Sequence, residues 1–244
     1  NFVSINGVLF SKDMSTLLCY PAARSGSSYT IPSGVTTLGY ESFACVKDLA
    51  HLALPASVST VDYSFSRLPN LASISVVDGN NKLTSVDGVL FSKDLTTLYF
   101  YPAGKSDTTY TIPDSVVTLA PRAFESCTSL VQLNTGSSLS SISSSAISAC
   151  TKLKRIILHN SIKTISQYNF SFCTSLSDIY FYGTDSEWST ISTGNESLQN
   201  ATVHYIREND SCSITLIQPS NGTIVLSEPV FAKGMTVTVG ATFN

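Results

Sequence analysis

The stretch that decides the fold reads Phe124-Glu125-Ser126-Cys127-Thr128-Ser129-Leu130, and it occurs three times in close succession. It returns at a constant interval as Ile147-Ser148-Ala149-Cys150-Thr151-Lys152-Leu153 and as Phe170-Ser171-Phe172-Cys173-Thr174-Ser175-Leu176. Earlier copies begin at Phe43 and Phe65, with an interval that is shorter by one position. Periods of roughly 20–50 residues are typical of stacked units that cannot bury their own apolar face alone. The sequence therefore predicts a solenoid.

A longer repeat is superimposed on the short one. Residues 4–43 match residues 85–124 at a constant offset of 81, with 22 identities over 40 positions. Each copy opens with two short apolar segments around a Ser-Lys-Asp turn, at residues 11–13 and 92–94, which predicts a β-hairpin. The hairpin lengthens its coil and accounts for the wide gap between Phe65 and Phe124.

An ordinary coil has three parts. It begins with a proline corner such as Ile112-Pro113, because proline fixes φ and ends any helix there. The Phe-x-x-Cys-x-x-Leu arm follows, and then a strand with the spacing Leu-x-x-Leu-x-Leu, as in residues 153–158. Alternate strand residues point to opposite faces, so stacked coils predict a parallel sheet along one side of the molecule.

This coil resembles the BspA-type bacterial leucine-rich repeat, with Ala123-Phe124-Glu125-Ser126-Cys127 as the best local match. Leu68 in place of the cysteine and Ile147 in place of the phenylalanine depart from its pattern. The resemblance covers residues 1–205. It implies an α/β leucine-rich-repeat solenoid, right-handed, rich in β-structure and poor in helix. It also implies an extracellular location, secreted or on a bacterial cell surface.

The solenoid is expected to end with an atypical unit that covers its open core. The segment around Trp188 is predicted to form this cap, as a short helix or turn from Ser186 to Ile191, with a strand at 200–205. A Trp188 side chain that stacks on carbohydrate is the alternative. Residues 206–244 are predicted to form a small all-β tail, with strands at 213–217, 223–226 and 236–242. This tail resembles part of an InlB B-repeat-like module.

The composition excludes several partners. Charged residues make up 13% of the 244-residue chain and the net charge is −3, so nothing attracts a polyanion such as nucleic acid. No apolar run reaches the roughly 18 residues that a membrane span needs. Because the chain begins inside a repeat and without a signal peptide, further coils or a leader are expected to lie upstream.

Six cysteines raise the question of disulfides or metal binding. Cys127, Cys150 and Cys173 recur once in each period, so stacking would bring their Cα atoms within disulfide range. The expected distance alone therefore does not decide whether a disulfide forms. Leu68 occupies the same slot, however, which favours a ladder of buried free thiols that behave as small apolar groups. Paired Cys or Cys/His spacings for zinc are absent from the sequence.

The sequence lacks the signatures of the common enzyme classes. It contains no G-x-S-x-G, no glycine-rich phosphate loop and no H-E-x-x-H motif. Of the three histidines, His51 is expected to face outward from a strand, His159 to sit at a corner and His204 to lie in the capping strand. The chain is therefore predicted not to be an enzyme, and neither a cofactor nor a metal is expected.

Strand residues that point outward and do not repeat are the best candidates for binding. Exposed tyrosine, arginine and amide side chains are typical anchors of interfaces, although tyrosine also occurs in sheets simply for its β-propensity. The predicted binding residues are Tyr99, Tyr101, Gln132, Asn134, Arg155, Asp178 and Tyr180.

These observations favour a non-catalytic extracellular recognition or adhesion module of a bacterial surface protein. Its expected partner is a host protein or a glycan, bound by a monomeric chain that does not insert into a membrane in this segment. A stalk or spacer that presents another domain is the alternative, and a polysaccharide-active enzyme is a third class.

Overall fold

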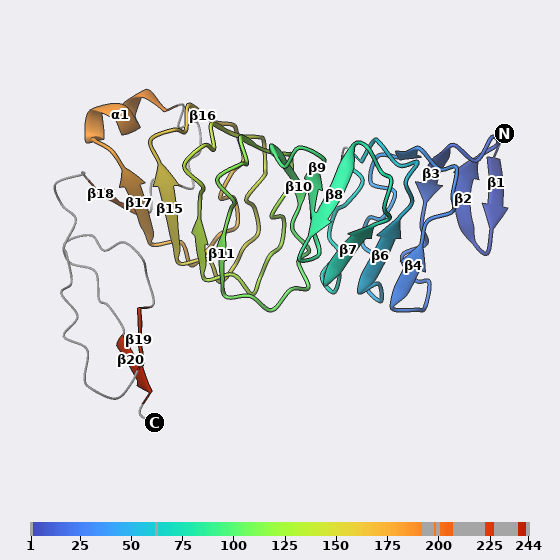
Figure 1. The fold of residues 1–244 in the computed structure, drawn as a ribbon, viewed down its shortest axis with the longest axis horizontal. Coiled ribbons are helices and arrows are strands. Elements are labelled where there is room, and N and C mark those ends of the chain that lie inside the picture. Colours follow the sequence, from blue (N-terminus) through green and yellow to red (C-terminus); the bar gives the residue numbers. More distant parts are fainter. Residues whose placement is uncertain are drawn as a thin grey trace.

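The computed structural model describes residues 2–61, 63–191, 198, 201–206, 223–226 and 239–242. It is an elongated stack of coils in which the first hairpin and the last coil lie at opposite ends (Figure 1). A single short α-helix is present in these described ranges, and the remaining regular elements are β-strands. The predicted β-rich solenoid with little helix is confirmed.

Parallel strands run along one side of the stack, as predicted, but in two separate sheets. The strands of the first sheet are β4 (Ser28–Thr30), β6 (His51–Leu54) and β7 (Ser73–Val76). The strands of the second sheet are β11 (Thr109–Thr111), β13 (Gln132–Asn134), β15 (Arg155–His159), β17 (Asp178–Tyr182) and β18 (Thr202–Ile206). The constant period of the repeat sets the register, because Arg155 pairs with Gln132 on one side and with Asp178 on the other.

The chain opens each long repeat with two hairpins. The strands are β1 (Phe2–Ile5), β2 (Val8–Ser11) and β3 (Thr16–Cys19) in the first copy, and β8 (Leu83–Val86), β9 (Val89–Ser92) and β10 (Thr97–Phe100) in the second. The β2–β3 and β9–β10 hairpins are the predicted ones. The β1–β2 and β8–β9 hairpins were not predicted, although Asn6-Gly7 and Asp87-Gly88 are strong hairpin signals and all four residues have positive φ.

A second line of strands follows the proline corners. Each of these strands has two residues: β5 (Thr37–Leu38), β12 (Thr118–Leu119), β14 (Ser141–Ile142) and β16 (Thr164–Ile165). Three of them continue the sheet that contains the second hairpin, in the order β16-β14-β12-β10-β9-β8. The corners were predicted as turns alone, because two residues are too few to show a strand period.

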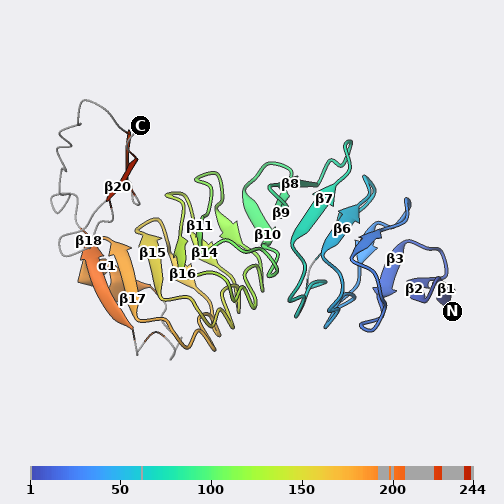
Figure 2. The same cartoon turned by 90° about the horizontal axis from the view of Figure 1, so that it is seen from below.

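The second hairpin divides the hydrophobic core in two. It lies between β7 and the second half of the stack (Figure 1, Figure 2). Leu83, Leu90 and Phe100 pack into the core of the first half. Val89 and Phe91, on the other side of the same hairpin, pack into the core of the second half. Because strand residues alternate, one hairpin supplies an apolar face to each half.

The three cysteines of the repeat form a ladder inside the second core. Cys127, Cys150 and Cys173 are free and buried. The Cys127 thiol donates to the Tyr101 carbonyl oxygen at 3.7 Å, and the Cys150 thiol donates to the Phe124 carbonyl oxygen at 3.0 Å. The hydrogen bond with Cys127, followed by burial, raises the pKa of the Cys150 thiol well above its usual value. All three thiols are buried among apolar side chains, where free cysteine behaves as a small apolar group, so these cysteines serve packing.

The arms contain residues in the left-handed region that are not glycine. Successive coils place Ser126, Ala149 and Phe172 there, with φ of 62°, 56° and 61°. A residue with a Cβ is destabilised by roughly 1–2 kcal/mol in this region. The cost recurs in the tight arms of these coils. Phe172 is the extreme case, because its side chain is also 77% exposed and contributes little packing in return.

Replacing Phe172 with asparagine, which tolerates positive φ, is therefore expected to stabilise the protein by about 0.5–1 kcal/mol. Urea denaturation followed by circular dichroism measures the gain. Val77→Asn is the matched control, because Val77 is 50% exposed but lies outside the left-handed region. An equal gain in both variants would show that lost surface hydrophobicity, and not the backbone, is responsible.

A helix and a strand occupy the segment that was predicted to form a cap. Helix α1 (Asp185–Thr190) begins at a capping box in which Thr184 and Glu187 bond each other reciprocally. The Trp188 ring packs on Phe181 with centroids 5.3 Å apart and lies against the second core. This packing supports the capping role of Trp188. Strand β18 follows, as predicted.

The tail is described in two short segments. Strand β19 (Thr223–Leu226) pairs in antiparallel fashion with β20 (Val239–Thr242). Both lie within segments predicted as strands. The predicted strand at 213–217 and the turn at 220–222 lie outside the described residues.

Candidate binding surface

The outward side of the last three strands of the second sheet carries the largest group of non-repeating side chains. We call it the His–Tyr face, and its members are Arg155, Ile157, His159, Asp178, Tyr180, Tyr182 and His204. On β15 and β17 they alternate with buried residues of the core, such as Ile156 and Ile179, both 0% exposed, and on β18 His204 lies between the partly buried Val203 and Tyr205. Strand alternation thus brings these residues to one surface.

Aromatic rings on this face stack from strand to strand. The His159 and Tyr182 rings lie 4.6 Å apart with an angle of 11° between their planes. The Tyr180 and His204 rings also lie 4.6 Å apart, at 16°. This spacing is close to the distance between neighbouring strands, so the rings stand side by side across the sheet. In each stack the flat faces of the two rings cover one another.

A hydrogen bond fixes one of the two stacks. His204 Nε2 lies 2.7 Å from Asp178 Oδ1, and the Ser177 hydroxyl donates to Asp178 Oδ2 at 2.6 Å. The hydrogen bonds from Ser177 and from His204 hold the pKa of the Asp178 carboxyl below its usual value. Both side chains are more than one third exposed, so the pair adds little stability, about 0–1 kcal/mol. Its main effect is to orient the imidazole.

The other histidine of this face is half-buried. Burial lowers the pKa of His159, while the nearby Asp114 carboxylate acts in the opposite direction. The folded-state pKa is thus below the unfolded value of about 6.5. The resulting stability is fully present above that value and is lost as the pH falls through the folded-state pKa.

We therefore expect the free energy of unfolding to fall as the pH is lowered from about 7.5 to 5, and His159→Gln to flatten this dependence. Asp114→Asn should steepen it, because the carboxylate that favours protonated His159 is removed. Urea denaturation at several pH values measures the slopes. A His159→Gln slope equal to that of the parent chain would contradict the assignment.

Four of the seven predicted binding residues lie on this sheet and are half-buried, facing outward. Arg155, Asp178 and Tyr180 belong to the His–Tyr face, and Asn134 lies next to Ile157 on the adjacent strand. Gln132 stands in the same column as Arg155, yet it is only 5% exposed. Its amide donates to Asn134 Oδ1 at 2.9 Å, so the side chain leans along its own strand. The expectation of an exposed Gln132 was wrong.

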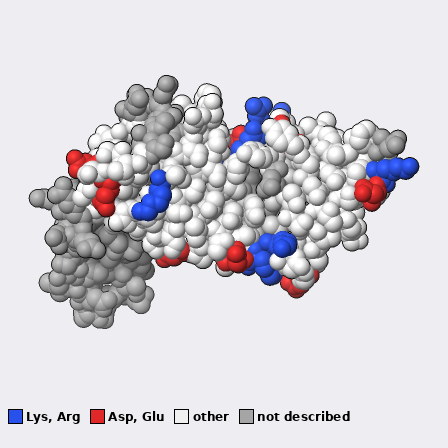
Figure 3. All heavy atoms as spheres, turned by 90° about the horizontal axis from the view of Figure 1, so that it is seen from above, with Lys and Arg blue, Asp and Glu red and all other residues white. Residues whose placement is uncertain are grey.

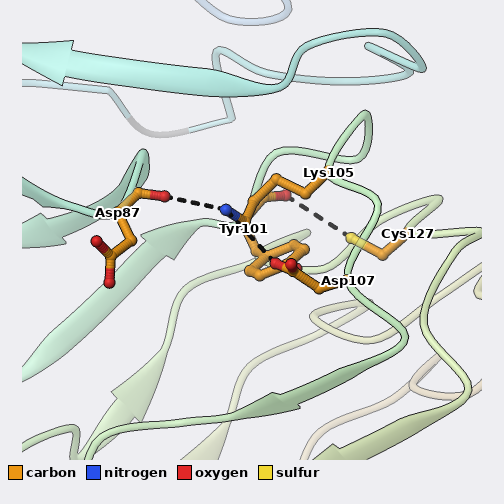
Figure 4. A network of polar contacts seen from close by, with 5 residues as sticks. All are labelled: Asp87, Tyr101, Lys105, Asp107 and Cys127. Atoms are coloured by element: carbon orange, nitrogen blue, oxygen red, sulfur yellow. Dashed lines mark hydrogen bonds and ion pairs between the residues drawn. The ribbon is translucent and has the colours of Figure 1, made fainter.

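Tyr101 is a clear correction, because it is a core residue that is 1% exposed (Figure 4). Its ring stacks on Phe124 at 5.1 Å, and its hydroxyl donates to Asp107 Oδ2 at 2.7 Å. Lys105 reaches over the ring, 5.8 Å from its centroid. The pairing of β9 and β10 shifts register between Leu98 and Phe100, and this bulge breaks the alternation from which an outward Tyr101 was inferred.

Tyr99 lies away from the His–Tyr face, in β10 of a different sheet. It is half-buried and packs against the core of the first half. With Tyr63 and Pro121 it lines a recess of about 10 Å³, enough for roughly one water molecule. The predicted binding residues thus lie in three environments, namely the second sheet, the hydrophobic core around Tyr101 and the recess beside Tyr99.

His159 and His204 were not among the predicted binding residues. His159 and Tyr182 are separated by one repeat period, which was a usable signal. Tyr180 pairs with His204 one position beyond that period, because the capping coil is slightly longer. Because of the extra residue, the fixed repeat period does not align Tyr180 with His204.

Other chemistries find no support in the described part of the chain. It contains no group of three His, Cys, Asp or Glu side chains suited to a metal ion. None of its helices has the length and apolar character of a membrane span. On the face in Figure 3, charged side chains are scattered among uncharged ones and form no extended basic surface.

The stacked coils, parallel sheets and buried leucine ladder define a leucine-rich-repeat solenoid. A family model described as the BspA type leucine rich repeat region matches residues 19–106 and 98–218, with six copies. The chain belongs to this family, which confirms that part of the resemblance. No curated protein matches the chain.

Several solved structures resemble the chain at low sequence identity, and the one with a TM-score above 0.5 shows the same fold. A leucine-rich repeat protein from Eubacterium ventriosum is 20% identical with a TM-score of 0.56, over 74% of this chain and 54% of the other. The pneumococcal vaccine antigen PcpA is 23% identical with a TM-score of 0.47, over 72% and 61%. A Treponema pallidum leucine-rich repeat protein is 20% identical with a TM-score of 0.42, over 70% and 76%. The chain therefore spans about half to three fifths of the length of the first two.

Proposed function

We propose that the chain is an extracellular, non-catalytic recognition or adhesion module, secreted or displayed on a bacterial surface, and that its His–Tyr face binds a protein partner. The observation that carries this proposal is the pair of upright His–Tyr stacks flanked by Arg155 and Asp178. Tyrosine and arginine are among the residues most enriched in interface anchors. The family, whose extended solenoid surfaces suit macromolecular partners, supports the same proposal.

The ring geometry favours a protein over a glycan. Sugar rings bind aromatic side chains through the flat ring face, as π-systems prefer contact through their negative face to apolar C–H groups. Here Tyr180 has His204 against one face and Ile157 next to it in the same column. The Tyr180 hydroxyl stands at the edge of its ring, and a phenol hydroxyl pairs with backbone and polar side chains of a protein. A glycan is the second candidate partner.

The proposal is tested by binding of the parent chain to arrays of host extracellular proteins and of glycans. The double variant Tyr180→Ala, Tyr182→Ala is expected to weaken protein binding at least about 30-fold, as loss of central aromatic anchors does. The matched control is Tyr40→Ala, Tyr168→Ala, because these tyrosines are exposed on the arms. Equal weakening in both variants would contradict a specific role of the His–Tyr face.

The alternative function, a stalk or spacer, gives a different result. A spacer requires a rigid stack and no particular surface residue. Neither double variant would then alter cell adhesion mediated by the full surface protein, and the arrays would give no partner at micromolar concentration. Release of products from a panel of polysaccharides would instead support the third class, an enzyme.

A further inference from the structure

The two copies of the long repeat contain the same group of three packed rings, which we call the aromatic cradle. Its members are Tyr20, Tyr29 and Phe43 in the first copy and Tyr101, Tyr110 and Phe124 in the second. The centroid of the central ring lies 4.9 and 5.3 Å from its two neighbours in the first copy, and 4.7 and 5.1 Å from them in the second. The two cradles therefore have nearly the same shape.

The second copy shows which chemical group fits at the edge of the cradle (Figure 4). The Tyr101 hydroxyl donates to Asp107 Oδ2 at 2.7 Å, and Lys105 Nζ lies 3.4 Å from the same oxygen. Lys105 Nζ also lies over the Tyr101 ring, 5.8 Å from its centroid, and donates to the Asp87 carbonyl oxygen at 3.0 Å. One carboxylate oxygen thus receives both a hydroxyl hydrogen bond and a positive charge.

The first copy keeps the hydroxyl and a cation but has no carboxylate at this position. At the offset of 81, Tyr20 and Arg24 correspond to the tyrosine and the lysine of the second copy, and Gly26 corresponds to its aspartate. The Arg24 guanidinium lies over the Tyr20 and Tyr29 rings, 5.6 and 5.8 Å from their centroids. Its Nη1 donates to the Asn6 carbonyl oxygen. Within the described part of the chain, no carboxylate pairs with Arg24 and no hydrogen bond reaches the Tyr20 hydroxyl.

The place that a carboxylate would take in the first copy is open to solvent. A Cβ added at Gly26 would meet no other atom within 4 Å, and the neighbouring Ser25 and Ser27 are exposed. In the second copy the Asp107 side chain is 44% exposed, although the coil of residues 51–77 packs on that hairpin. A ligand can therefore reach the edge of such a cradle even where a coil covers the hairpin.

We propose that Arg24 and the Tyr20 hydroxyl form a carboxylate-binding site, and that its ligand is an aspartate or glutamate side chain of a partner protein. The planar guanidinium matches a carboxylate, and its N–H groups other than the one bound to Asn6 are available as donors. The second copy favours a peptide source, because its bound carboxylate is an aspartate side chain. Tyr29 belongs to β4 of the first sheet, so this site is separate from the His–Tyr face.

The second copy also supplies the probe for an experiment. The blocked peptide acetyl-Ser-Asp-Thr-amide has the sequence of residues 106–108, and acetyl-Ser-Asn-Thr-amide is the uncharged control. A peptide in solution is preferable to Gly26→Asp, because φ at Gly26 is 117°, where a residue with a Cβ is strained. Titration of the full chain, followed by the backbone amide NMR signals of residues 24–29, measures the Kd. The aspartyl peptide is expected to bind at least about tenfold tighter than the control peptide.

Substitutions in the first copy test the two groups separately. Arg24→Gln should weaken binding of the aspartyl peptide at least about tenfold, and Tyr20→Phe, which keeps the ring, about fivefold. Arg24→Lys should retain most of the binding, because the second copy has lysine at this position. Arg67→Gln is the matched control, since Arg67 is exposed in the first half but lies outside the cradle. Equal effects of Arg24→Gln and Arg67→Gln would overturn the proposal.

The second copy provides a test that leaves the first copy unaltered. Asp107→Ala removes the internal carboxylate and keeps the Tyr101 hydroxyl and Lys105. In this variant the aspartyl peptide should also shift the amide signals of residues 105–110, which it leaves unchanged in the parent chain. Signals of residues 105–110 that stay unshifted would overturn the proposal, because a cradle of this kind would then not bind a carboxylate from solution.

Two further probes separate the sources of the acidic group. The methyl glycoside of N-acetylneuraminate carries a glycan carboxylate, and inorganic phosphate carries none. We expect both to bind more weakly than the aspartyl peptide, because neither has the peptide groups that flank the carboxylate in the second copy. Tighter binding of the glycoside would assign the site to an acidic glycan and overturn the proposed partner. Tighter binding of phosphate would overturn a carboxylate as the ligand.

Discussion

Replacing Asn80 with alanine is expected to lower the free energy of unfolding by about 3–5 kcal/mol, because buried hydrogen-bonding groups lose their partners. Asn80 is 2% exposed. Its amide nitrogen donates to Pro55 O at 3.2 Å and to Val58 O at 2.8 Å. Its amide oxygen accepts from Lys82 N at 2.9 Å and from Leu83 N at 2.8 Å. One side chain thus joins the corner of a coil to the start of the second hairpin.

Asn70 provides the matched control for this substitution. Its amide nitrogen also donates to a carbonyl oxygen of the preceding coil, Lys47 O at 2.8 Å, but at an exposed position. Water replaces such a bond, so Asn70→Ala should cost less than about 1 kcal/mol. Equal losses in the two variants would contradict the importance of burial. Asn80→Asp separates the two roles, because it keeps an acceptor and places negative charge against two carbonyl oxygens.

The position of Asn80 also predicts how the variant unfolds. In a stack of repeats each coil contacts only its neighbours, so a weak junction can uncouple the two ends. Trp188 is the only tryptophan and lies in the last coil, where its fluorescence reports on the second half. In Asn80→Ala the urea transition seen by circular dichroism should therefore begin at lower denaturant than the transition seen by fluorescence. Coincident transitions would show that the halves still unfold together.

Gly104→Val is expected to destabilise the protein by about 3 kcal/mol, since overpacking against rigid backbone cannot be relieved by a side-chain rotation. A Cβ at Gly104 would lie 2.5 Å from the Asn70 carbonyl carbon and 2.8 Å from Leu71 O. The Gly104 amide also donates to Leu71 O at 2.7 Å, so moving the chain aside costs a hydrogen bond. The same urea experiment measures the loss.

The first copy again supplies the control, because Ala23 occupies the equivalent exposed position. Ala23→Val should change stability by less than about 0.5 kcal/mol. A comparable loss at both positions would point to the backbone conformation shared by the two copies. A loss at Gly104 alone ties the effect to the close approach of the two halves.

The repeat could be predicted from the sequence, and so could most of the core. Phe124, Cys150 and Leu153 recur because each coil presents the same slot to its neighbours, and all three are buried. The outward positions of Arg155, Asp178 and Tyr180 followed from strand alternation alone. Tyr101 was misplaced because a bulge in β10 changes which side of the strand it faces, and composition does not reveal a bulge.

The residues that share the His–Tyr face could be identified only from the tertiary structure. Tyr180 and His204 are one residue farther apart in the sequence than His159 and Tyr182. Only the register of β17 with β18 therefore brings Tyr180 against His204. The register of β15 with β17 likewise places His159 on Tyr182. Such a face consists of residues that are neighbours across adjacent strands. A repeat of fixed period predicts only those neighbours that are one full period apart.

The sequence by itself determined the architecture, because an apolar repeat of such short period can bury its side chains only by stacking one coil on the next. It also determined the inert character of Cys127, Cys150 and Cys173, since a slot shared with leucine is an apolar slot. The tertiary structure alone decided where the stack is interrupted. The second hairpin faces two cores at once, with Leu83 and Leu90 in one and Val89 and Phe91 in the other. The coils stacked on its two sides decide which side chains meet which core, and the residues of the hairpin itself do not specify these coils.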